Sequence, residues 1–274
     1  MSRFTVLDDT RRHPDLAERI TALLHTVAPL VEETTGLPLP PEVRFRLLTP
    51  RAWRRAEIAY KLRVLTRDIA DPGLSVPPEH VSAVRLALKA TGFIPALVWP
   101  LVVGSTVIAA DGRDETLVMP RALRHSGLLA HEPSLCQMLS HELTHHAQDA
   151  ACGDSTEWRS FFPQLRKIDP GSIPAVVEGH ARWADQQVTT ALYGAPVDHV
   201  RQARRSPRAR LLVRAPGLRR LGPSGDAYAQ GTRLIGHAVT VHGTDLVNRV
   251  WKDTSLLPTR SEIAEPDAWI ARIA

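Results

Sequence analysis

The segment His141-Glu142-Leu143-Thr144-His145 decides how the rest of this sequence is interpreted. In an α-helix, residues four apart lie one turn apart on the same face, so the two imidazoles can bind one metal ion together. The glutamate after the first histidine then lies beside the open metal position, where its carboxylate can accept a proton from a metal-bound water. The pattern therefore predicts a metal site that includes its own base.

The residues around this motif favour a single helix over residues 132–152. Leu135, Leu139 and Leu143 recur every four residues, as on a buried helical stripe. Glu132-Pro133 is typical of a helix start, and Gly153 of a helix end. The alternative, two helical histidines that only pack or are solvated, fits this context less well.

Two histidines do not make a stable catalytic zinc site, so a third protein ligand is required. One known arrangement uses a third histidine six residues after the second, but that position is Ala151, and Gln148 stands where that pattern has glycine. The other arrangement takes a glutamate from a later helix. Glu178 follows at a distance that allows a loop and a returning antiparallel helix. Asp185, on the same face of that helix, can hydrogen-bond a ligand histidine and fix its tautomer.

Hydrophobic periodicity predicts the remaining elements. Helices are expected over 15–34, 51–70, 78–90, 175–193, 226–252 (as one or two helices) and 266–273. A strand is expected over 43–47, and the β signal continues from 93 to 119 with a hairpin turn at Asp111-Gly112. The hairpin edge either binds an extended peptide or only forms the sheet on which the motif helix packs.

The composition is that of an ordinary globular protein, with 274 residues, of which 43% are hydrophobic and 23% charged. The longest apolar run, residues 94–103, contains two prolines and is too short to span a bilayer, and we find no signal peptide. Cys136 and Cys152 are too far apart on one helix for a disulfide, which favours a reducing cytoplasm.

Residues 201–220 form a basic segment with eight arginines and no acidic residue. Such a run is typical of a solvated face or loop, and the alternative is a docking surface for an acidic partner. Because the net charge of +5 is otherwise dispersed, the sequence disfavours a nucleic-acid partner. It carries no signal for an oligomeric state.

Further motifs indicate a resemblance to a known protein family. Glu178-Gly-His-Ala181 resembles the Glu-Gly-x-Ala ligand segment of gluzincin peptidases, such as the aminopeptidase N type and the clostridial-type collagenases, and Tyr228-Ala-Gln-Gly231 resembles their Tyr-x-x-Gly segment. With the tail at 257–263 and 266–272, the chain is similar to a zincin-like family labelled zinc-dependent metalloprotease or hydrolase. Some members of that family are labelled as associated with deazaflavin-coenzyme biosynthesis. The likeness covers roughly residues 95–274, and the first 90 residues match less clearly.

This resemblance implies an α+β, mostly helical, zincin-like metallopeptidase fold. An N-terminal lobe, residues 1–153, would carry a small mixed sheet and the motif helix, and a helical C-terminal lobe, residues 154–274, would supply the third ligand. The metal would be Zn²⁺, held by His141, His145 and Glu178 in the cleft between the lobes. Glu142 would be the general base and then the proton shuttle.

Other residues have two open interpretations each. Tyr228 is either an oxyanion donor or a packing residue, and Asp149 either supports a ligand histidine or is solvated. His146 and His180 point away from the metal and are expected to pack or to lie behind the ligands.

Two functions remain. The first is a zinc-dependent hydrolase, a peptidase or amidase acting on a peptide or amide substrate; the alternative is a zincin-like binding or regulatory module without hydrolysis. The presence of Glu142 favours the enzyme, because a metal site used only for binding needs no base there.

Overall fold

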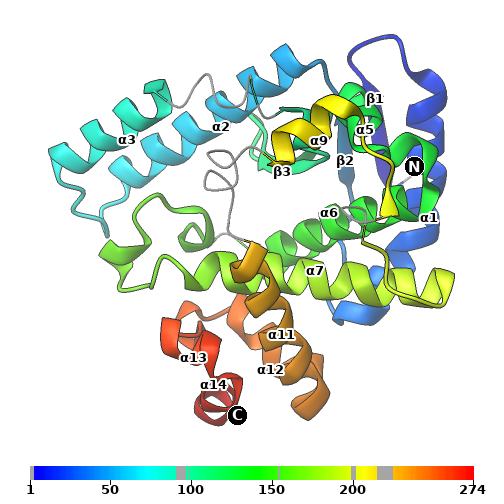
Figure 1. Cartoon of the computed structure of the whole chain (residues 1–274). Coiled ribbons are helices and arrows are strands. Elements are labelled where there is room, and N and C mark those ends of the chain that lie inside the picture. Colours follow the sequence, from blue (N-terminus) through cyan, green and yellow to red (C-terminus); the bar gives the residue numbers. More distant parts are fainter. Residues whose placement is uncertain (1–2, 91–96, 98, 154, 199–201, 215–224) are drawn as a thin grey trace.

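The computed structural model of the chain describes residues 3–90, 97, 99–153, 155–198, 202–214 and 225–274. Most of these residues are helical, and four strands form one small mixed sheet (Figure 1). The predicted α+β, mostly helical fold is therefore confirmed.

The bounds of the described elements are given from the N-terminus onwards. The strands are β1 (Phe4–Asp8), β2 (Val43–Leu47), β3 (Ser105–Ile108) and β4 (Asp114–Val118). The first helices are α1 (Pro14–Thr35), α2 (Pro50–Ala70), α3 (Pro78–Ala90), α5 (Pro120–Ser126) and α6 (Glu132–Cys152). The later helices are α7 (Ser172–Tyr193), α9 (Pro207–Arg214), α11 (Gly225–His242), α12 (Thr244–Asn248), α13 (Arg260–Ala264) and α14 (Pro266–Ile273).

The sheet has the strand order β1-β2-β4-β3, in which β3 is antiparallel to β4 and the other pairs are parallel. The predicted hairpin across Asp111-Gly112 is confirmed as β3 and β4. The alternation in β2 buries Val43, Phe45 and Leu47 on one face, as a period of two requires. The hairpin thus places β3 at an edge of the described sheet.

Two parts of the strand assignment differ from the prediction. We did not predict β1, because only Phe4 in it is buried and no alternating pattern results; its pairing with β2 makes it a strand. Part of the β structure expected before β3 is wrong, since Trp99–Leu101 forms a 3-10 turn, while residues 93–96 and 98 lie outside the described residues. Pro100 has no N–H to donate to a strand partner, which explains the turn.

The motif helix α6 lies between the sheet and α7, and Figure 1 shows α11 to α14 on the far side of α7. The bounds of α6 are those predicted: the His131 side chain accepts a hydrogen bond from the Ser134 N–H at its start, and the helix ends at Gly153. One core cluster includes residues from Phe4 to Ile273, so the spans 1–153 and 154–274 both contribute to it. The division into lobes at residue 153 stays a prediction.

The two cysteines are free, as predicted. None of the described helices combines the length and the apolar character that crossing a bilayer requires. The described part of the basic segment, residues 202–214, packs on α5 and on the turn at Trp99: the Arg208 guanidinium lies 5.4 Å from the Trp99 ring centroid, and Ser206 hydrogen-bonds His125 at 2.8 Å. The other residues of 201–220 lie outside the described residues.

The tail motif, residues 257–263 and 266–272, packs the end of the chain against α11. Thr259 and Glu262 form a reciprocal capping box at the start of α13, and Glu262 also accepts a 2.6 Å hydrogen bond from Arg272 on α14. The Trp269 indole is fully buried and donates to the Leu256 carbonyl at 2.8 Å. The motif residues are thus accounted for by capping and packing.

Helices α7 and α11 contact each other backbone to backbone at Gly179 and Gly231. A Cβ built on Gly179 would lie 2.4 Å from the carbonyl carbon of Gly231, and one on Gly231 would lie 2.2 Å from the Ala175 oxygen. Only residues without a side chain fit such an approach. The glycines of the two gluzincin-like motifs therefore set the distance between the helix that carries Glu178 and its neighbour.

This crossing generates a stability prediction. We expect Gly231→Ala to lower the free energy of unfolding by about 3 kcal/mol or more, because its Cβ collides with α7 backbone that cannot rotate away. Gly236→Ala is the matched control on the same helix, where the nearest atom, in the Trp183 ring, would lie at 3.4 Å. That variant should be neutral or gain up to about 1 kcal/mol from helix propensity. Chemical denaturation measures both, and equal effects would contradict the crossing.

Candidate metal centre

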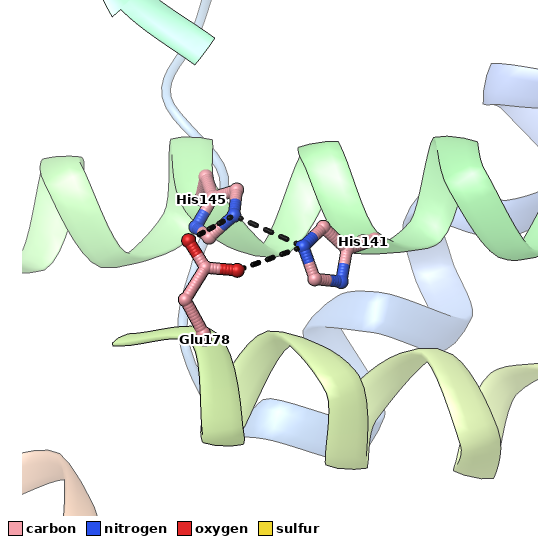
Figure 2. A group of neighbouring side chains, drawn as sticks. All are labelled: His141, His145 and Glu178. Carbon is pink, nitrogen blue, oxygen red and sulfur yellow. Dashed lines mark hydrogen bonds and ion pairs between the residues drawn. The ribbon is translucent and has the colours of Figure 1, made fainter. Parts of the chain in front are cut away.

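Three side chains from two helices converge on one point. His141 and His145 extend from consecutive turns of α6, and Glu178 faces them from α7 (Figure 2). The Nε2 atoms of the histidines are 3.2 Å apart, and the Glu178 oxygens lie 3.4 Å from His141 Nε2 and 3.9 Å from His145 Nε2. One ligand atom from each residue lies within 4.8 Å of the others, a spacing that permits a shared metal ion.

The tautomer of His145 follows from the residue behind it. The Gln148 amide nitrogen donates to the Val177 carbonyl at 2.9 Å, and a carbonyl can only accept. The Gln148 oxygen therefore faces His145 Nδ1, at 2.9 Å, and that nitrogen must carry the proton. The Nε2 lone pair of His145 is then directed at the site.

His141 is held in the same sense. Its Nδ1 lies 3.2 Å from Asp185 Oδ2, and Gln137 donates to the other Asp185 oxygen, also at 3.2 Å. With both Nδ1 atoms protonated, two Nε2 lone pairs and a carboxylate face one another. Such a group of acceptors can bind one metal ion together.

The spacing fits a tetrahedral metal ion. Metal–nitrogen bonds of about 2.0–2.1 Å at a tetrahedral angle place two nitrogens about 3.3 Å apart, close to the separation of the two Nε2 atoms. In the metal-free state a proton takes this place. Burial lowers the pKa of His141, but the hydrogen bonds to Asp185 and Glu178 outweigh burial and raise that pKa to about 10. A metal must therefore displace a proton from His141.

Glu142 lies beside the three converging residues and is directed to the sheet. Its Oε2 accepts a 2.7 Å hydrogen bond from the Thr106 hydroxyl on β3, and its Oε1 lies against Gly104, where a Cβ would come within 2.5 Å. The side chain is almost fully buried but lines a cleft of about 1250 Å³ together with His141 and Glu178. A carboxylate in this position can accept a proton from a molecule in the cleft without binding the metal.

The structure does not place Asp149 against a ligand histidine. Its carboxylate pairs with Arg159, while Gln148 occupies the Nδ1 of His145. Arg159 also binds Asp114 at 2.9 Å; burial and then the Asp149 charge raise the pKa of Asp114 to about 6. Asp149 thus belongs to a partly buried ion-pair cluster, of which Asp149 and Arg159 line the cleft.

Tyr228 lies in the first turn of α11, but its side chain is outside the described part of the structure, so its role as oxyanion donor stays a prediction. His146 and His180 are fully buried and point away from the three ligand candidates. Burial lowers the pKa of each to about 3, so both rings are neutral. His180 Nδ1 lies 3.0 Å from the Gln148 amide nitrogen and so helps to fix its orientation.

Sequence analysis named Asp185, which does contact His141, but it missed the two glutamines that also orient the ligands. Gln137 and Gln148 lie four positions before His141 and three after His145, which are spacings that share a helix face. That spacing was the available signal, although an amide at such a position is usually solvated. Thr106 gave no signal, because its partner Glu142 is far away in the sequence.

Comparisons with known proteins give one family model and one similar solved structure. Residues 171–270 match the family model described as zincin-like metallopeptidase. The predicted resemblance is confirmed over this span, which contains Glu178 but not His141 and His145. A solved structure from Chloroflexus aurantiacus, described as "a putative hydrolase with a novel fold", is similar with a TM-score of 0.57 and 18% identity, over 96% of this chain and 91% of that chain. That likeness concerns the fold alone. None of the curated proteins matches the sequence.

The ligand set generates a binding prediction. We expect about one divalent metal ion per chain and loss of binding in His141→Ala, His145→Ala and Glu178→Ala. Asp185→Ala should weaken binding by only about 10–100-fold, because Asp185 acts through His141. Titration of the metal-free variants with Zn²⁺ measures these affinities. Equal, small effects of Glu178→Ala and Asp185→Ala would place the third ligand elsewhere.

The pKa of His141 generates a pH prediction. The protonated ring cannot bind metal, so below its pKa of about 10 each fall of one pH unit should lower the apparent affinity by about tenfold. At pH 8, calorimetry in buffers of different ionisation enthalpy should detect protons released on Zn²⁺ binding. Asp185→Asn removes a charge that raises this pKa and should release up to one proton fewer. Identical release from both proteins would contradict this account of His141.

Proposed function

We propose that this chain, zincin-like over residues 171–270, is a zinc-dependent hydrolase that cleaves a peptide or amide bond. One observation supports this most: Glu142 adjoins the three candidate ligands, lines the same cleft and is not itself a ligand. A metal site used only for binding gains nothing from a carboxylate buried in that position, because desolvating a charge is costly.

The donor set favours zinc. Two neutral imidazoles and one carboxylate are a known catalytic zinc set, and calcium and magnesium prefer sites made of oxygen ligands. His141, His145 and Glu178 would hold the ion. When bound, zinc would polarise the scissile carbonyl and lower the pKa of its water towards about 7.

Glu142 carries out the proton transfers in this proposal. Its carboxylate accepts a proton from the attacking water, holds it, and gives it to the nitrogen of the leaving group. Asp185 and Gln148 keep both histidines in the tautomer that leaves Nε2 unprotonated. Tyr228 remains our candidate for donating a hydrogen bond to the developing oxyanion.

The cleft suits an extended substrate. Residues 101–106, from the turn before β3 into this edge strand, line it together with the candidate ligands. An extended peptide could add to this edge, with its scissile bond towards Glu142. The cleft is lined from both 1–153 and 154–274, so we retain the division into two lobes that share the site. The two free cysteines favour a reducing compartment, and we propose the cytoplasm.

The test of this function is Glu142→Gln, which keeps the shape of the side chain and removes its basicity. We expect zinc content and fold to be retained and hydrolysis to fall by about 10²-fold or more. A peptide library digested with and without a chelator and read by mass spectrometry supplies the substrate. Glu132→Gln, in the first turn of the same helix and paired with Arg19, is the matched control and should keep full activity.

Two outcomes would contradict the proposal. Cleavage that survives both the chelator and Glu142→Gln would come from another active site. A zinc-loaded protein that cleaves no peptide or amide, and binds a partner equally well with Glu142→Gln, would be a binding module.

A further inference from the structure

A chain of hydroxyl groups connects Glu142 to a buried histidine on the next turn of the same helix. The Thr106 hydroxyl donates to Glu142 Oε2 at 2.7 Å and lies 2.8 Å from the hydroxyl of Thr116, its cross-strand partner. The Thr116 hydroxyl lies 2.9 Å from His146 Nε2. Thr116 and His146 are fully buried, so water does not compete for the bond between them.

The direction of every bond in this chain is fixed by elementary counting. The Thr106 hydroxyl donates its single proton to a carboxylate oxygen of Glu142. Thr106 must then accept from Thr116, whose proton is thereby used. Thr116 must in turn accept from His146 Nε2–H. The donors therefore all point towards the carboxylate.

His146 favours this direction independently. Its Nδ1 is buried and has no hydrogen-bond partner among the described residues. In the direction derived above, Nδ1 carries only a lone pair. Reversing the chain would place a proton there and create a buried N–H group without an acceptor, which native proteins rarely contain.

The two carboxylate oxygens of Glu142 have different surroundings. Oε2 is held by Thr106, while Oε1 lies against Gly104 at the wall of the cleft. Gly104 does not have a left-handed backbone, so glycine is required here for space and not for conformation. Any side chain at 104 would take the place of Oε1.

We propose that Thr106, Thr116 and His146 form a directed hydrogen-bond chain that positions Glu142, keeps Oε2 as an acceptor, and leaves Oε1 as the oxygen that takes the proton from water. Only the role of Oε1 in taking the proton from water rests on the proposed function. Thr106 contacts the base, and Thr116 and His146 act through it, so all three are positioning residues.

The direction of the chain is tested without any substrate. Long-range ¹H–¹⁵N correlation spectra of the histidine rings, assigned with His146→Gln, should show His146 protonated at Nε2 and not at Nδ1. Thr116→Val should remove the acceptor and speed the exchange of the Nε2 proton with solvent. An Nδ1-protonated ring in the wild type, or unchanged exchange in Thr116→Val, would overturn the chain whether or not the protein is a hydrolase.

The positioning role is tested on a peptide that the wild type cleaves. Thr106→Val keeps the shape of the residue and should lower kcat by about tenfold with unchanged KM and zinc content, since small misplacements of a catalytic group cost one to two powers of ten. Thr106→Ser keeps the hydroxyl and should restore kcat to within about threefold. Thr21→Val is the matched control: Thr21 on α1 is also partly buried, but its hydroxyl donates to the Ala17 carbonyl, away from the cleft. A loss of kcat no larger in Thr106→Val than in Thr21→Val would overturn the role.

A crystal structure of the zinc-loaded Thr106→Val variant would show the position of the Glu142 carboxylate directly. We expect the Glu142 carboxylate to rotate away from its wild-type orientation. A carboxylate that stays in place without the Thr106 hydroxyl would overturn the positioning role, even if no substrate is found.

Discussion

The contact between α6 and α7 is the constraint on which the rest of the site depends. Each helix alone presents only part of a ligand set, and the three ligand atoms meet because the helices are held in one register. The Gln148 amide sets that register where it matters, since it binds the Val177 carbonyl on α7 and the Nδ1 of His145 on α6. On the other side of α7, the glycine contact with α11 holds the helix from behind.

This arrangement concentrates acceptors in a buried place. Glu178, Asp185 and two imidazole nitrogens face a region from which water is partly excluded, and such groups are costly to bury without a positive charge. In the metal-free protein a proton on His141 supplies that charge, as its raised pKa indicates. A divalent cation satisfies the same acceptors better, because it can accept a lone pair from each of them. Metal affinity and the stability of the α6–α7 contact are therefore linked.

Helical periodicity places the motif residues on two faces of α6 that have different roles. His141 and His145 are four residues apart and face α7, and Glu142 and His146 are also four residues apart and face the sheet, about 100° further round the helix. The first face holds the ligands, and the second holds the base and the hydroxyl chain. The sheet thus has a chemical role, because β3 and β4 supply the threonines that bind the base.

Features that local spacing controls could be predicted from the sequence. The extent of α6, the hairpin at Asp111-Gly112, and the four-residue separation of His141 and His145 all depend on neighbours along the chain, for which hydrophobic period and capping residues are sufficient signals. Features that depend on groups distant in the sequence are set by how the elements pack in the folded chain. Strand β1 exists because it pairs with β2 and carries little pattern of its own. Asp149 turns to Arg159, because the partly buried guanidinium offers it a positive charge and Gln148 already occupies the Nδ1 of His145. Thr106 reaches Glu142 because the sheet packs on α6, and a lone threonine in a strand carries no local sign of the carboxylate it will contact.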